Sequence, residues 1–142
     1  MRTLILLLVA LSAQACAAAP AALPGTVKSP TDVDVRQKGA GKARIALLAQ
    51  GKNAFVGRLE LAPNVAVPEH QDATEEYIYV LAGGGMLTMD GKVYAVEPGS
   101  IIFMPANATV SFQNGPDPMV GLQIFAGPDP ARKYETWQPE KN

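Results

Sequence analysis

The chain has 142 residues with a single histidine, a single cysteine and a formal net charge of −1, and this length matches one domain of about 100–150 residues. One cysteine excludes an internal disulfide and cysteine-rich metal centres, and one histidine excludes any site that needs two imidazoles from one chain. The balanced charge argues against nucleic-acid binding, which needs a basic surface to meet phosphates.

Residues 1–15 are predicted to be a lipoprotein-type signal peptide. Arg2 gives a positive start, and residues 4–11 form an apolar run that is shorter than the roughly 20 residues needed to span a bilayer. The following Ala13-Gln14-Ala15 fits an A-x-A cleavage site. A buried helix or a membrane anchor is the alternative, but the run is short and no stop-transfer cluster of charges follows it. We therefore predict an exported protein.

Cys16 directly follows this cleavage signature. The run Ser12-Ala13-Gln14-Ala15-Cys16 resembles a bacterial lipobox, although Ala13 stands where Leu is commoner. This resemblance implies that Cys16 is the lipidated first residue, that the lipid is the chain's only membrane contact, and that the protein lies in the periplasm. Ala17 in place of Asp indicates retention at the outer membrane. In the alternative, the signal is cut later and Cys16 is removed with it.

Residues 16–42 are rich in Ala, Pro and Gly and show little periodicity, which predicts a flexible tether with a short edge strand at residues 32–36. From residue 43 onward the pattern is of short apolar runs separated by turns, and Asp90-Gly91 is typical of a tight hairpin. The expected strands are residues 44–49, 55–61, 65–68, 76–81, 86–89, 93–96, 101–104, 109–113 and 120–125. Strands at this spacing predict an all-β antiparallel sandwich or barrel over residues 43–127.

The tail, residues 128–142, is predicted to hold one short helical turn between Asp129 and Trp137. In such a turn Tyr134 and Trp137 lie three residues apart on one face. We expect these two aromatic side chains to seal an open edge or end of the barrel.

The stretch from Asn64 to Gly83 contains polar residues at intervals that match a known motif. His70 follows Asn64 after five residues, Asp72 comes two residues later, and Glu76 follows after three more. This run resembles the first motif of the cupin superfamily, which reads Gly, five residues, His-x-His, three or four residues, Glu, six residues, Gly. Asn64 stands at the first Gly of that motif, and Asp72 stands at its second His.

A second run, from Pro105 to Asn114, resembles the second cupin motif, Pro-x-Gly-x-x-His-x-x-x-Asn. Asn107 replaces the Gly and Val110 replaces the His. Asn tolerates the left-handed backbone region best after Gly, so we expect both turns to persist. The resemblance covers residues 44–127 and implies a small jelly-roll β-barrel. It says less about function, because cupins include isomerases, dioxygenases, epimerases, decarboxylases, storage proteins and sugar-binding domains.

The resemblance implies that His70, Asp72 and Glu76 stand at positions where metal-binding cupins hold a metal ion with three imidazoles and one carboxylate. His70 and Asp72 are two residues apart on an extended segment, so their side chains point to one face. An inward Glu76 places Ile78 and Val80 beside it. We therefore expect a mostly apolar pocket with a small polar cluster, which is the usual build of a small-molecule site.

Three hypotheses for function remain open. In the first, His70, Asp72 and Glu76 hold a divalent metal such as Mn or Fe for an oxygenase or isomerase reaction. In the second, no cofactor is bound and the barrel holds a small molecule, with His70 as the catalytic acid or base if turnover occurs. In the third, the domain is a non-catalytic interaction module of the cell envelope. Because cupins often pair through edge strands, the resemblance also implies a homodimer.

Overall fold

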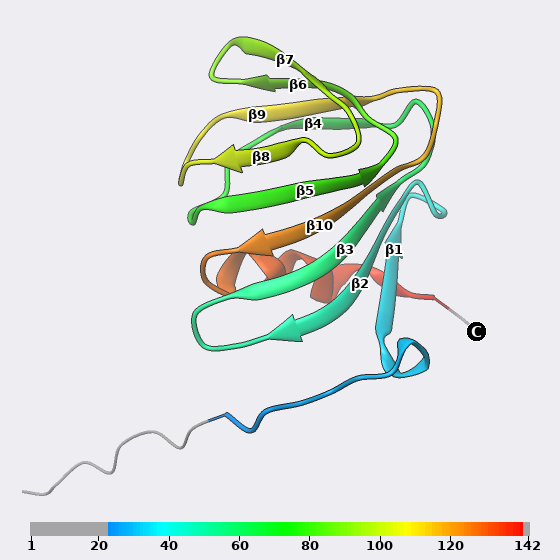
Figure 1. Cartoon of the computed structure of the whole chain (residues 1–142), viewed down its shortest axis with the longest axis vertical. Coiled ribbons are helices and arrows are strands. Elements are labelled where there is room, and N and C mark those ends of the chain that lie inside the picture. Colours follow the sequence, from blue (N-terminus) through cyan, green and yellow to red (C-terminus); the bar gives the residue numbers. More distant parts are fainter. Residues whose placement is uncertain (1–22, 141–142) are drawn as a thin grey trace, which may run out of the picture.

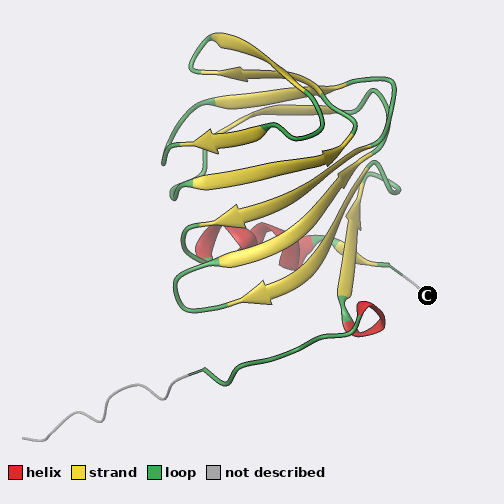
Figure 2. Ribbon diagram, in the orientation of Figure 1, coloured by secondary structure: helices red, strands yellow, loops and turns green. Residues whose placement is uncertain are grey.

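The computed structural model describes residues 23–140, which form two antiparallel sheets and two short 3-10 helices (Figures 1 and 2). The elements in chain order are η1 (Pro30–Asp32), β1 (Asp34–Lys38), β2 (Ala43–Gln50), β3 (Phe55–Leu61), β4 (Ala66–His70), β5 (Glu76–Ala82), β6 (Gly85–Met89), β7 (Lys92–Val96), β8 (Ile101–Met104), β9 (Val110–Asn114), β10 (Met119–Phe125), η2 (Asp129–Thr136) and β11 (Gln138–Pro139). One sheet has the strand order β11-β1-β2-β3-β10-β5-β8 and the other β4-β9-β6-β7. This is a jelly-roll-like sandwich, and the predicted fold class is confirmed.

The turns between strands follow the residues that favour them. Asp90 and Gly91 have φ angles of 48° and 77°, and they join β6 to β7 as a tight hairpin. Asn64 and Asn107, which stand at the two Gly positions of the motifs, have φ angles of 59° and 62°. Both asparagines therefore adopt the left-handed conformation that the sequence predicts for them.

The larger sheet extends further toward the N-terminus than the predicted barrel boundary at residue 43. β1 occupies residues 34–38 rather than 32–36, and it pairs with β2 on one side and with β11 on the other. It is therefore an inner strand and not the expected edge strand. The predicted signal peptide and Cys16 lie outside the described residues, and they stay predictions. Along residues 23–140, no helix has the length and apolar character needed to cross a membrane.

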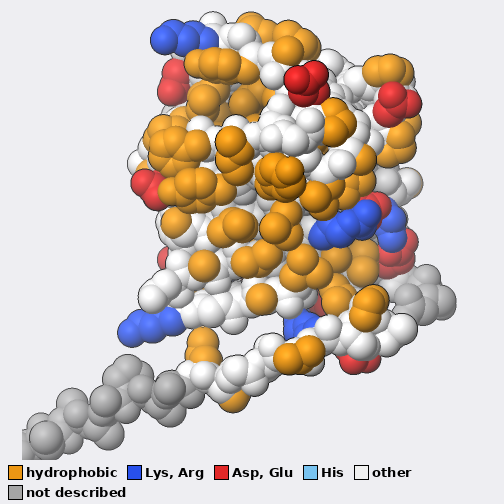
Figure 3. Space-filling model, viewed as in Figure 1, with side chains coloured by type: hydrophobic (Ala, Val, Ile, Leu, Met, Phe, Trp, Pro, Cys, Tyr) orange, Lys and Arg blue, Asp and Glu red, His pale blue; other side chains and the backbone are white. Residues whose placement is uncertain are grey.

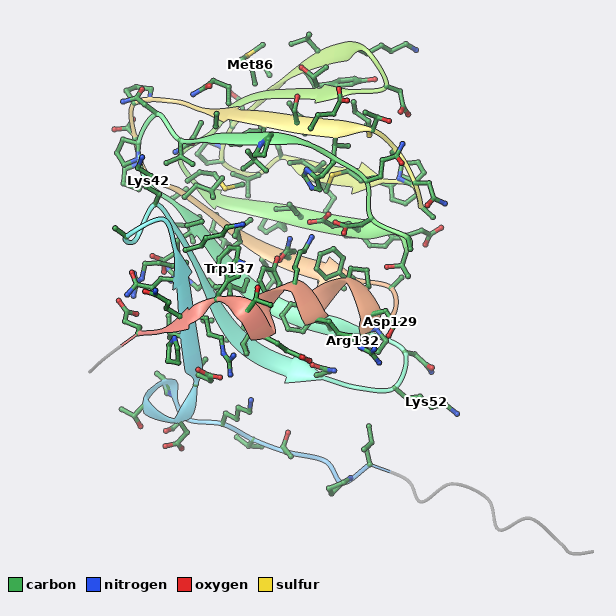
Figure 4. All side chains as sticks on the ribbon, turned by 180° about the vertical axis from the view of Figure 1, so that it is seen from behind. Lys42, Lys52, Met86, Asp129, Arg132 and Trp137 are labelled. Atoms are coloured by element: carbon green, nitrogen blue, oxygen red, sulfur yellow. The ribbon has the colours of Figure 1, made fainter. Side chains whose placement is uncertain are left out.

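The tail forms an eight-residue helix, η2, rather than a single turn. Figures 1 and 4 show it lying against β3 and β10, on the side of the larger sheet that the smaller sheet also covers. Tyr134 is buried, and its ring meets Trp137 edge to face with centroids 4.9 Å apart. The smaller sheet and η2 thus share the inner face of the larger sheet between them.

Two hydrophobic clusters reflect this division. The first lies between the sheets and includes Val80 and Leu87. The second lies between the larger sheet and η2, where Phe55 and Phe125 pack against Tyr134. Burying each of these large side chains contributes about 1.5–3 kcal/mol to stability. The part of the inner face between the two clusters carries the polar residues described below.

Asn114, the last residue of the second motif, has a structural role. Its side chain is buried, and its amide Nδ2 donates to the carbonyl oxygens of Ala62 at 2.8 Å and of Asp117 at 3.1 Å. These bonds hold the end of β9 to the turn that contains Asn64. The asparagine of the motif therefore fixes two loops and lies apart from the polar cluster.

The outer face of β5 and β8 exposes large apolar side chains. Tyr79 and Leu81 on β5 and Ile101 and Phe103 on β8 are each about half exposed or more. Figure 3 shows hydrophobic side chains gathered over this face of the molecule. Exposed apolar patches of this kind often mark protein contacts. The homodimer stays a prediction.

Candidate functional site

The two sheets and η2 enclose a cavity of about 610 Å³. Most of its wall is aliphatic and comes from both sheets, with Leu61, Ile78 and Val110 among the lining residues. Its polar lining residues include His70 on β4, Asp72 in the loop between β4 and β5, Glu76 on β5, Gln123 on β10, and Lys133 and Tyr134 on η2. This volume and this mixture of surfaces lie in the range of small-molecule sites, roughly 300–1,000 Å³.

Glu76 is the first residue of β5, and its inward position follows from strand alternation with the buried Ile78 and Val80, as the sequence predicts. Only 4% of it is exposed. Gln123 Nε2 donates to Glu76 Oε1 at 2.5 Å, and the Tyr134 hydroxyl donates to Gln123 Oε1 at 2.6 Å. A chain of hydrogen bonds therefore runs from η2 through β10 to the carboxyl group on β5.

Asp72 and Lys133 form an ion pair across the cavity. Lys133 Nζ on η2 donates to the two carboxylate oxygens of Asp72 at 2.8 and 3.1 Å. The same ammonium lies 4.8 Å from the centre of the Phe125 ring, within the range of a cation–π contact. The Asp72 side chain is 16% exposed and that of Lys133 is 36% exposed. The pair is therefore partly shielded from solvent and still reachable from the cavity.

His70 is the last residue of β4 and lines the same cavity. Its Nδ1 donates to the carbonyl oxygen of Pro68 at 2.9 Å, since a carbonyl can only accept. Its Nε2 is consequently the ring nitrogen that lies toward Asp72, 4.0 Å from Oδ2. The structure thus brings all three residues singled out in the sequence, His70, Asp72 and Glu76, to one cavity.

Burial raises the pKa of Glu76 from 4.5 to about 7. The hydrogen bond from Gln123 and the charge of Lys133 act to lower this pKa, and Asp72 acts to raise it. Burial also raises the pKa of Tyr134, so its hydroxyl stays a neutral donor. A carboxyl group with a pKa near 7 can both give and take a proton at neutral pH, as general acid–base catalysis requires.

Three residues of the site were not predicted from the sequence. Gln123 lies on β10 at an inward position, between the buried Gly121 and Phe125, and this polar residue within an apolar strand was the available signal. Tyr134 was expected only to seal the barrel, and its hydroxyl in fact orients Gln123. Lys133 gave no local signal, because one lysine in a charged tail is ordinarily solvated.

The residues present do not fit the metal site that the cupin motifs imply. Val110, at the position of the missing histidine, has no donor atom, and both oxygens of Asp72 already accept hydrogen bonds from an ammonium. Glu76 Oε1 already accepts a hydrogen bond from Gln123. A divalent ion would have to displace a charge of its own sign from Asp72. Within the described residues, no three His, Cys, Asp or Glu side chains are grouped to hold a metal ion.

Comparison with known proteins agrees with this fold. Residues 57–125 match the family model described as "Cupin domain". No curated protein sequence matches the chain. The matched region ends at the last residue of β10, so η2, with Lys133 and Tyr134, lies beyond it.

Solved structures with a similar fold include several cupins of low sequence identity. An RmlC-like cupin from Shewanella frigidimarina has a TM-score of 0.66 at 13% identity, covering 73% of this chain and 92% of that one. KdgF from Halomonas sp. has a TM-score of 0.65 at 15% identity, covering 76% and 99%. A predicted oxalate decarboxylase from Thermotoga maritima has a TM-score of 0.64 at 20% identity, covering 72% and 99%. At these identities the likeness is one of fold alone.

Proposed function

Residues 57–125 match the cupin domain, and from this premise we propose that the chain binds a small organic molecule in the cavity of its barrel. The observation that carries the proposal is the cavity of about 610 Å³, whose walls are mostly aliphatic and include a small number of polar side chains. Apolar walls supply binding free energy, and a few fixed polar groups orient the bound molecule.

The buried polar chain also favours a ligand site over a purely structural role. Buried ion pairs and polar networks give little net stability compared with apolar packing. A domain that served only as an interaction module would need no chain from Tyr134 through Gln123 to Glu76 inside its core. The metal-dependent oxygenase or isomerase is less well supported, because the donor set does not fit a metal ion.

A ligand screen with a cavity-filling variant tests the proposal. Small organic acids, alcohols and sugars are screened for compounds that raise the melting temperature, since binding to the folded state stabilises it. Val67 is half-buried and lines the cavity, so we expect Val67→Trp to weaken binding of any such compound at least tenfold. Val93 is 60% exposed on β7, and Val93→Trp is the matched control that should leave binding unchanged. A screen without stabilising compounds, or equal binding by both variants, contradicts the proposal.

We also propose that the chain is exported and anchored by a lipid on Cys16, as the signal-like N-terminus indicates. Cys16→Ala is then expected to move the protein from the membrane fraction to the soluble periplasm, because the lipid is the predicted membrane contact. Fractionation with immunoblotting measures this shift, and Thr26→Ala, at an exposed position outside the lipobox-like run, serves as a control. If Cys16→Ala stayed in the membrane fraction, the lipid anchor would be excluded.

A further inference from the structure

We propose that the Lys133 ammonium supplies the positive charge of this site. It would then take the role that a metal ion has in cupins with a complete set of metal ligands. We further propose that it binds the charged group of an organic anion whose apolar body fills the cavity. This inference rests on the proposed function and names the class of ligand. It is carried by the contacts of Lys133 and by the balance of charge around the cavity.

The contacts of Lys133 leave it able to bind a further group. An ammonium has three N–H donors, and among residues 23–140 its hydrogen-bond acceptors are the two oxygens of Asp72. One N–H therefore remains for an acceptor on a ligand. The side chain is 36% exposed and lines the cavity, so a bound molecule can reach it. Asp72 holds the ammonium in place, and the Phe125 ring lies 4.8 Å away.

The charge around the cavity also favours an anion. Lys38, Lys42 and Lys133 line it, against two carboxyl groups, Asp72 and Glu76. In the part of the chain that the structure describes, Lys38 and Lys42 form no ion pair, and Figure 4 shows Lys42 at the turn between β1 and β2. A cavity with an excess of positive charge and low-dielectric walls attracts anions.

The rest of the cavity defines the remainder of the ligand. Leu61, Ile78, Leu87 and Val110 come from both sheets and present aliphatic surface to it. A molecule that is polar along its whole length would leave its polar groups unpaired against these side chains, which costs binding free energy. The site therefore suits an organic acid with one charged end and an apolar body, such as a medium-chain carboxylate.

Two probes of equal length test this assignment: hexanoate and its neutral counterpart 1-hexanol, titrated calorimetrically into the chelator-treated protein. We expect hexanoate to bind at least tenfold more tightly than 1-hexanol, and added Mn²⁺ to leave its affinity unchanged. Lys133→Met should weaken hexanoate binding to the level of 1-hexanol without changing 1-hexanol binding. A merely structural role for Lys133 would weaken both probes alike. Lys133→Arg keeps the charge and should keep most of the preference for hexanoate.

Arg132 provides the matched control. It precedes Lys133 on η2, its side chain is 74% exposed, and it pairs with Asp129 at the end of η2 away from Trp137 (Figure 4). Arg132→Met removes the same charge from the same helix and should leave hexanoate binding unchanged. The inference is overturned if Lys133→Met binds hexanoate as wild type does, if binding requires Mn²⁺, or if hexanoate binds no better than 1-hexanol. If neutral compounds still bind in that last case, the proposed function stands without it.

Discussion

Replacing Tyr134 with alanine is expected to lower the free energy of unfolding by about 3–5 kcal/mol, the usual cost of removing a large buried aromatic side chain. Only 3% of Tyr134 is exposed. Its ring packs 5.8 Å from that of Phe55 and 4.9 Å from that of Trp137, and its hydroxyl donates to Gln123. The substitution therefore opens a space between η2 and the larger sheet and also leaves a buried amide oxygen unpaired.

Chemical denaturation measures this effect, and two further variants separate its parts. Tyr134→Phe keeps the ring and loses only the hydroxyl, so we expect it to cost about 1–3 kcal/mol, the penalty for an unsatisfied buried acceptor. Tyr79→Ala, on the half-exposed outer face of β5, is the control and should change stability far less. If Tyr134→Ala and Tyr79→Ala lower the free energy of unfolding equally, η2 contributes little to the core. The conclusion that η2 helps to form the cavity would then be wrong.

The strands and turns of this domain could be predicted because their signals are local. Alternation of apolar and polar residues predicted the strand at 55–61, and the observed β3 covers Phe55–Leu61. Asn64 and Asn107 were expected in the left-handed conformation because short polar side chains tolerate it, and both have positive φ. The inward position of Glu76 followed from the two-residue period of a strand. Each of these inferences needed only a few neighbouring residues.

The polar network of the cavity could not be predicted, because it joins distant segments of the chain. Lys133 pairs with Asp72 from 61 residues away, and Tyr134 meets Gln123 only because η2 folds back onto β10. No local pattern in the tail specifies where its side chains will point. The chemistry of Asp72 could not be judged either, since its partner lies outside the cupin motifs. The sequence thus pointed to His70, Asp72 and Glu76, but it could not show that Lys133 pairs with Asp72.

The second large effect concerns pH. Wild type is expected to lose about 3 kcal/mol of stability relative to Glu76→Gln as pH rises from about 4.5 to about 8. Glu76 has a pKa of about 7 in the folded protein against 4.5 ordinarily, so the folded state binds its proton more tightly than the unfolded state does. The stabilisation is complete below pH 4.5 and is lost as pH rises through 7. The difference between these two pKa values corresponds to roughly 3 kcal/mol.

Glutamine isolates this contribution because it has nearly the same shape and carries no charge at any pH. Its carbonyl can still accept from Gln123 Nε2, so the hydrogen-bond chain to Tyr134 is kept. Urea denaturation of both proteins from pH 4 to pH 9 gives the difference in unfolding free energy, in which the other ionisable groups cancel to first order. Glu75→Gln, at the exposed neighbouring position, is the control and should follow wild type.

A wild-type curve parallel to that of Glu76→Gln would mean that the carboxyl group is not held in its protonated form. In that case the site would present two carboxylates to Lys133, and the excess positive charge that favours an organic anion would be smaller.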